Sequence, residues 1–141
     1  MSSRSVLRLI DANANRALEG LRVCEEIVRF HYDSPRLFRR TRVLRHAVAA
    51  AVRRLPVTAV DLVGSRGSAR DVGRRAPASR VDSLERSLLI NFQRTKESLR
   101  TLEECARLLA PALTASFQRL RFAAYDLERD CLLTLAAVRH R

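Results

Sequence analysis

The sequence predicts an all-α fold, a four-helix bundle built from a duplicated helical hairpin. Apolar residues make up 47% of the 141 residues, aromatic ones only 5%, and glycine and proline are scarce. This composition suits helices that pack through Leu, Val and Ala. Apolar residues recur with helical spacing, and one pattern of polar residues is written twice along the chain. Together these observations favour two similar helical halves.

The first half is expected to hold two helices. The first covers about residues 5–30 and ends at the sequence HYDSP. Ser34 followed by Pro35 is typical of a helix start, because the hydroxyl caps the first turn and proline needs no hydrogen-bond acceptor there. A second helix is therefore expected over about 35–54.

A crossover loop is expected over residues 55–80. Three of the four glycines, two prolines and several arginines fall in this stretch, which makes it rich in Gly and Arg. Its sequence VGSRGSARDVGRR offers backbone N–H groups and arginines that suit a phosphate, but it lacks the spacing of a P-loop.

The second half repeats the hairpin. Asp82 with Glu85 resembles a capping box that opens a third helix over about 83–109. Pro111 then breaks the chain, and a fourth helix is expected over 111–139. A chain of this length fits one domain, residues 1–141.

The repeated pattern consists of asparagine, arginine and glutamate at intervals of mostly three or four residues, which places most of them on one stripe of a helix. Each residue of the second copy lies 78 positions after its counterpart. The first copy is Asn13, Arg16, Glu19, Arg22, Glu25, Glu26 and Arg29, and the second is Asn91, Arg94, Glu97, Arg100, Glu103, Glu104 and Arg107.

Two interpretations of these stripes stay open. Arginines and glutamates three or four residues apart can simply pair on an exposed helix. Apolar residues border the first stripe on both edges, however, and partly desolvated charges must be paired or bind something. Two such stripes that face each other would line one polar groove, with Gly20 and Ser98 small enough for close approach.

The formal charge of +12 comes almost entirely from arginine and favours anionic partners such as nucleic acid, an acidic membrane surface or a phosphorylated small molecule. A GC-rich genome would also enrich arginine. Alternation with glutamate and the scarcity of aromatic residues disfavour nucleic acid. With neither a signal peptide nor a long apolar run, the sequence predicts a cytoplasmic protein that does not enter a membrane.

The segments IDANANRALEGLRVCEE and NFQRTKESLRTLEE resemble the ThiD2 family of hydroxymethylpyrimidine phosphate kinases. The resemblance implies an ATP-dependent kinase of thiamine biosynthesis, which would use ATP and Mg²⁺ to convert a phosphorylated pyrimidine to its diphosphate. It also implies a functional link to thiamine-phosphate synthase, to which this domain is fused in some proteins. A homodimer is a further expectation, since helical bundles with apolar flanks often pair.

Site residues are predicted on that basis. A first set of residues, predicted to be catalytic, would bind phosphates through arginines and orient these arginines through glutamates. A second set would bind the pyrimidine, the nucleotide or the metal. Glu19 and Glu97 are also candidate Mg²⁺ ligands. The first set is Arg16, Glu19, Arg22, Arg94, Glu97 and Arg100, and the second set is Asn13, Asn15, Arg66, Asp71, Gly73 and Asn91. The alternative is a non-catalytic basic bundle that binds nucleic acid or a protein partner such as thiamine-phosphate synthase.

Overall fold

The computed structural model describes residues 3–139, and these residues contain helices and no strand. The all-α prediction is confirmed for this part of the chain. The ends of the predicted domain, residues 1–2 and 140–141, lie outside the described residues. A single domain and a duplicated hairpin stay predictions.

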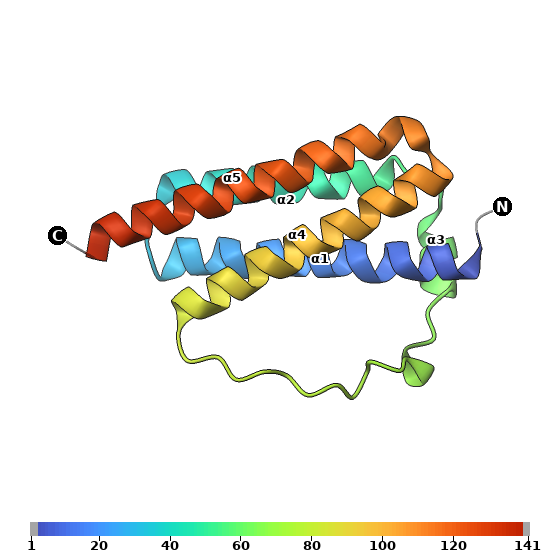
Figure 1. Ribbon diagram of the computed structural model, residues 1–141, viewed down its shortest axis with the longest axis horizontal. Helices are drawn as coiled ribbons and strands as arrows, with labels where there is room; N and C mark the ends of the chain where they lie inside the picture. The colour runs from blue at the N-terminus through green and yellow to red at the C-terminus, as the bar shows by residue number, and fades with distance from the viewer. Residues whose placement is uncertain (1–2, 140–141) are drawn as a thin grey trace.

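Four long helices form the body of the molecule (Figure 1). They are α1 (Arg4–Phe30), α2 (Pro35–Arg53), α4 (Leu84–Leu109) and α5 (Thr114–Arg139). α1 packs against α2 and α4, while α5 packs against α4 and α2. Each long helix therefore contacts two others around a shared apolar core.

The core is aliphatic, as the composition predicts, with a few aromatic exceptions. The largest fully buried side chains come from all four long helices and include Ile10, Leu21, Leu37, Val48, Leu88, Phe92, Leu99 and Phe117. Their helical spacing gives each long helix one apolar face, which it turns toward the others.

The helix starts follow local capping. Ser34 accepts a hydrogen bond from the Leu37 N–H at 3.3 Å, so this predicted start is confirmed. α4 opens differently from the prediction, because Ser83, and not Asp82, caps it by accepting from the Arg86 N–H at 3.1 Å. A serine oxygen at this position satisfies an N–H group that the first helical turn leaves free.

The predicted loop at 55–80 contains more structure than expected. Thr58 and Asp61 form a capping box that starts the short helix α3 (Ala59–Gly64), which packs against α1. A single turn, η1 (Ser68–Arg70), follows. The fourth predicted helix likewise begins with a separate turn, η2 (Pro111–Leu113), before α5. The long irregular stretch is therefore 71–83.

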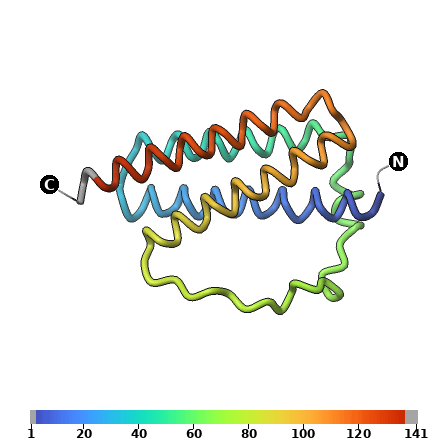
Figure 2. Tube along the Cα trace, viewed as in Figure 1, coloured from blue at the N-terminus to red at the C-terminus, as the bar shows by residue number. Residues whose placement is uncertain are grey.

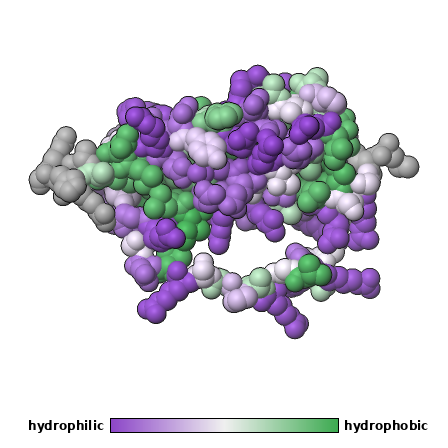
Figure 3. Space-filling view, viewed as in Figure 1, coloured by the Kyte–Doolittle hydropathy of each residue, from purple (hydrophilic) through white to green (hydrophobic). Residues whose placement is uncertain are grey.

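Residues 71–83 run along one side of the body, and their path is clear in the tube of Figure 2. Every residue from 71 to 83 is exposed. Figure 3 shows open space between this segment and the helices, whose surface facing the space is mainly hydrophilic. No described helix is long and apolar enough to cross a membrane.

Candidate functional site

Helices α1 and α4 approach each other closely at Gly20. A Cβ atom built at Gly20 would lie 2.5 Å from Thr95 Oγ1 and 3.0 Å from the Asn91 carbonyl oxygen. Thr95 Oγ1 in turn donates a hydrogen bond to the Ala17 carbonyl at 3.3 Å. Glycine is thus required here by packing, and it lets the two polar stripes meet.

A groove of about 640 Å³ lies along this crossing and is called the central groove below. Each residue that α1 contributes has its repeat counterpart on α4, 78 positions later. The lining is Asn13, Arg16, Glu19, Gly20 and Val23 from α1 and Asn91, Arg94, Glu97, Ser98 and Thr101 from α4. The prediction that the stripes face each other across one polar groove therefore agrees with the structure.

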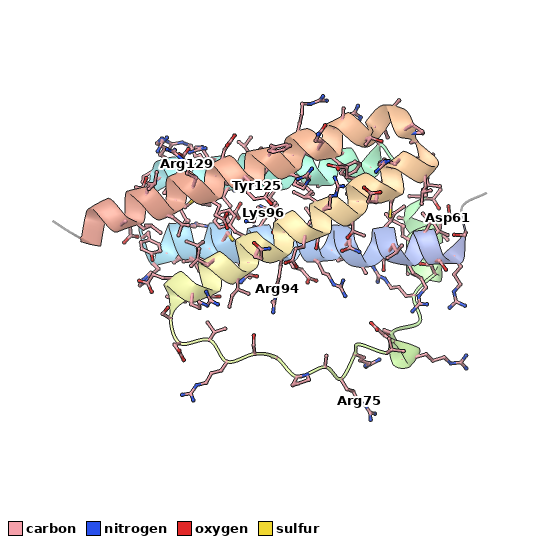
Figure 4. All side chains as sticks on the ribbon, viewed as in Figure 1. Asp61, Arg75, Arg94, Lys96, Tyr125 and Arg129 are labelled. Atoms are coloured by element: carbon pink, nitrogen blue, oxygen red, sulfur yellow. The ribbon has the colours of Figure 1, made fainter. Side chains whose placement is uncertain are left out.

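Arg16 and Arg94 are the two arginines of the central groove, and both are exposed. Neither forms an ion pair with a carboxylate among the described residues. Figure 4 shows Arg94 extending from α4 toward the space above the segment 71–83. Two unpaired guanidinium groups from equivalent helix positions give this groove its capacity to hold an anion.

Arg22 and Arg100 are placed differently, although they occupy the next arginine positions of the same stripes. Arg22 pairs with Glu25 and Glu26 at 3.1 Å each. Arg100 pairs with Glu103 and with Glu104. Both arginines lie outside the lining of the central groove. At these two positions the arginines therefore form structural ion pairs within their own helix, as the first interpretation of the stripes predicts.

Glu25 and Glu103 are buried, with exposures of 1% and 4%. Each receives a second arginine from the other helix of its hairpin, Arg45 of α2 at 3.2 Å and Arg121 of α5 at 3.2 Å. The same ion-pair arrangement thus closes both helical hairpins. A carboxylate can remain buried there because two arginines compensate its charge.

A second cavity, called the loop pocket, has a volume of about 520 Å³ and continues from the central groove through Asn13 and Arg16. It lies between α1 and the crossover segment, and its further lining is Ser5, Arg8, Leu9, Asp11, Ala12, Ser65, Arg66, Gly67, Ser68 and Asp71. The two cavities form one continuous site, because Asn13 and Arg16 line both of them.

Arg66 and Asp11 join the crossover segment to α1. The Arg66 Nε and Nη2 atoms donate to the two Asp11 carboxylate oxygens at 2.7 and 3.0 Å. This hydrogen-bonded pair raises the pKa of the Arg66 guanidinium above its ordinary value. Sequence reasoning missed Asp11, because its partner lies 55 positions away and no local pattern signals the pair.

The remaining predicted residues divide between the two cavities and the surface. Asn13 and Asn91 make equivalent hydrogen bonds, since each Nδ2 donates to the carbonyl four residues earlier, at 2.9 and 2.8 Å. Asp71 lines the loop pocket and accepts from the Gly73 N–H at 2.8 Å. Gly73 and Asn15 line neither cavity.

Glu19 and Glu97 both line the central groove, one from each helix. Glu97 accepts a hydrogen bond from Gln93 at 2.9 Å. The described residues contain no cluster of three or more His, Cys, Asp or Glu residues that would hold a metal by themselves. A cation in this groove would need oxygen ligands from a bound phosphate in addition to these two carboxylates.

Fold and site together define an all-helical protein with an arginine-bearing groove between two equivalent helices. The model of the ThiD2 family matches residues 8–130, and the chain belongs to that family. The predicted resemblance is confirmed.

Three relatives are named thiamine-phosphate synthase. The protein from Rhodopirellula baltica is 37% identical over 143 residues, which cover 99% of this chain and 37% of the relative. Those from Synechocystis sp. and Synechococcus sp. are each 37% identical and cover 93% and 96% of this chain. The chain spans 37 to 38% of the length of these relatives. No solved structure matches it.

The prediction of a hydroxymethylpyrimidine phosphate kinase is contradicted by these relatives, whose name refers to making thiamine phosphate and not to phosphoryl transfer from ATP. The residues explain the error. Arginines in a groove bind phosphate groups in many different reactions, so they carry no information on the bond that is made or broken. The name of the relatives refers to thiamine phosphate, which agrees with the predicted pathway.

Proposed function

We propose that this chain takes part in the synthesis of thiamine phosphate by binding a phosphorylated precursor in the central groove. The observation that carries the proposal is the contrast between the stripe arginines. Arg22 and Arg100 are neutralised by neighbouring glutamates, whereas Arg16 and Arg94 line the groove without a carboxylate partner among the described residues.

The arginines would hold the phosphate from two sides. A guanidinium group presents its N–H donors in a planar fork that matches two phosphate oxygens. Arg16 and Arg94 come from helices that are locked together at Gly20 and Thr95, so their backbone positions are fixed relative to each other. A ligand bound between them would be oriented with little loss of protein conformational entropy.

The rest of the lining suits a small polar ring. The amides of Asn13 and Asn91 and the hydroxyl groups of Ser98 and Thr101 lie in the same groove and offer hydrogen bonds to a heterocycle such as a pyrimidine. Val23 adds an apolar contact for the face of a ring. The lining therefore supports a phosphorylated pyrimidine as the precursor.

We propose Mg²⁺ and ATP only as ligands of the central groove, without phosphoryl transfer from ATP. Glu19 and Glu97 fit Mg²⁺, which takes one or two carboxylates together with phosphate oxygens. When bound, the ion would neutralise phosphate charge. ATP presents the same phosphate chemistry to Arg16 and Arg94.

The relatives supply the link to the synthase. They carry a segment like this chain within polypeptides of more than twice its length. We therefore propose that the chain acts together with a thiamine-phosphate synthase, whose further residues complete the reaction.

A chimera of the Synechocystis relative tests this function. The matching segment of that protein is replaced by this chain, and the strain is grown with and without added thiamine. We expect growth without thiamine from the unmodified chimera and none, or much slower growth, from a chimera that carries Arg16→Ala and Arg94→Ala.

The matched control removes two other arginines of the chain. Arg42 and Arg53 are exposed on α2, away from the groove, and their replacement by alanine removes the same total charge. This chimera should grow like the unmodified one. Normal growth of the Arg16 and Arg94 variant, or failure of the unmodified chimera although it is folded and expressed, would contradict the proposal.

A further inference from the structure

A third cavity lies at the end of the loop pocket that is farther along α1 from the central groove. It has a volume of about 200 Å³ and is lined by Arg4, Ser5, Arg8, Gly67 and Arg70. Ser5, Arg8 and Gly67 also line the loop pocket, so the three cavities form one continuous cleft. This third cavity is called the arginine pocket below.

The arginine pocket contains three positive side chains from two segments, α1 and η1, and no carboxylate of a described residue lines it. None of the three arginines forms an ion pair with any described residue. Arg4 and Arg8 lie one helical turn apart, where like charges repel and destabilise a helix. Arg70 adds a third charge from the opposite side.

Contacts with α1 hold the crossover segment in place, so that Arg70 stays near Arg4 and Arg8 despite their like charges. The Arg66–Asp11 pair fixes it to α1, and a Cβ atom at Gly67 would lie only 3.5 Å from Arg4 Nη2. Asp11 thus neutralises Arg66 in the middle of the cleft, while arginines without an ion pair among the described residues lie at both ends. An anion in the arginine pocket would relieve the repulsion there.

We propose that the arginine pocket is a second anion-binding subsite, so that the cleft holds two phosphate-bearing groups at once, one at Arg16 and Arg94 and one at Arg4, Arg8 and Arg70. The first of these rests on the proposed function. The second group is either a distal phosphate or diphosphate arm of the same ligand, or the phosphate of a second ligand.

Inorganic pyrophosphate serves as the probe, and isothermal titration calorimetry at fixed ionic strength counts the sites. The wild-type chain should bind two pyrophosphate ions. Arg8→Ala with Arg70→Ala should abolish one site or weaken it at least about tenfold, because charge-assisted hydrogen bonds to the anion are lost. Arg16→Ala with Arg94→Ala should abolish the other site.

The charge-matched variant Arg42→Ala with Arg53→Ala should retain both sites. A single site in the wild type that survives in the Arg8 and Arg70 variant would overturn the second subsite and leave the proposed function intact. Two sites that survive the loss of Arg16 and Arg94 would contradict the proposed function instead. If the charge-matched variant bound pyrophosphate as weakly as the Arg8 and Arg70 variant, the binding would reflect only the overall positive charge, and the second subsite would be overturned.

Fructose 1,6-bisphosphate, which carries a phosphate at each end, distinguishes the two sources of the second group. One molecule per chain, weakened by either pair of substitutions, would indicate that a single ligand spans the cleft. Two molecules per chain would indicate that separate ligands fill the two subsites. Binding that neither pair of substitutions changes would contradict the two-subsite arrangement.

Discussion

Gly20 determines how closely α1 and α4 approach. The backbone of Asn91 and the hydroxyl of Thr95 occupy the space that any side chain at this position would need. The same crossing brings the equivalent asparagines, arginines and glutamates of the two helices into one groove. The close packing at Gly20 therefore belongs to the same helix crossing that forms the site.

Gly20→Ala should lower the free energy of unfolding by about 1–3 kcal/mol, because the added Cβ lies 2.5 Å from Thr95 Oγ1 and overpacks the crossing. Urea unfolding followed by circular dichroism measures the change. Gly64→Ala is the control, since nothing lies within 4 Å of a Cβ there, and it should change stability little. Unchanged stability of Gly20→Ala would contradict the close packing.

Arg16 and Arg22 show where sequence reasoning about single residues stops. Both belong to the same stripe and both have a glutamate three positions later. Glu25 is buried and pairs with Arg22, whereas Glu19 is exposed and forms no ion pair with Arg16. The sequence could therefore predict a polar groove between the stripes, but not which arginines line it, because tertiary contacts decide which of them are neutralised.

At the scale of elements, the two helices of each hairpin are joined by an ion pair to one buried carboxylate. Arg45 joins α2 to α1 through Glu25, and Arg121 joins α5 to α4 through Glu103. Because both arginine side chains are mostly buried as well, these pairs differ from the exposed ion pairs elsewhere on the surface.

Arg45→Met and Arg121→Met should each lower the free energy of unfolding by about 2 kcal/mol, because a buried carboxylate then keeps only one arginine partner. Arg107→Met is the control. Arg107 pairs with the half-exposed Glu104, and its loss should cost at most about 0.5 kcal/mol. Chemical denaturation compares the three variants, and equal effects would show that the buried pairs have no special role.

Cys24 of α1 and Cys131 of α5 are free cysteines buried in the core. Burial raises the pKa of both thiols above the ordinary value, and that of Cys131 rises to about 11. In the unfolded chain the thiols ionise at about pH 8.5. Stability from the neutral thiols is therefore fully present below that pH and is lost as the pH rises toward 11.

Cys131→Ala should flatten this dependence. Urea midpoints measured between pH 8 and 10.5 should fall more steeply for the wild type than for the variant, because one thiol no longer ionises on unfolding. If the urea midpoints of the two proteins fell in parallel with pH, the raised pKa of Cys131 in the folded protein would be contradicted. The loss of packing at position 131 lowers the whole curve but does not change its slope with pH.

The elements themselves were largely readable from the sequence. Ser34 with Pro35 located the start of α2, and Pro111 located the break before α5, because caps and prolines act locally. α3 was missed. Its capping residues Thr58 and Asp61 lie in a stretch whose glycines and prolines indicate a loop, and its six residues are too few to show helical periodicity.

At the scale of the whole molecule, ion pairs determine which arginines contribute to the net charge of +12 without a neighbouring carboxylate. Glutamates and aspartates neutralise the arginines that hold the fold, such as Arg22, Arg45 and Arg121, and leave others free along one cleft. The family could be recognised from the sequence because the segments that carry the two stripes resemble it. The reaction could not, because phosphate-binding residues do not define it.

The most direct test of the central claim is calorimetric titration of the intact chain with hydroxymethylpyrimidine phosphate at one ionic strength, with and without Mg²⁺. The wild type and the Arg42→Ala/Arg53→Ala control should bind this ligand equally well. Arg16→Ala/Arg94→Ala should bind it at least about tenfold more weakly, since charge-assisted hydrogen bonds to phosphate are lost. Equal affinity of all three proteins, or no binding by the folded wild type, would contradict the claim that the central groove recognises a phosphorylated precursor.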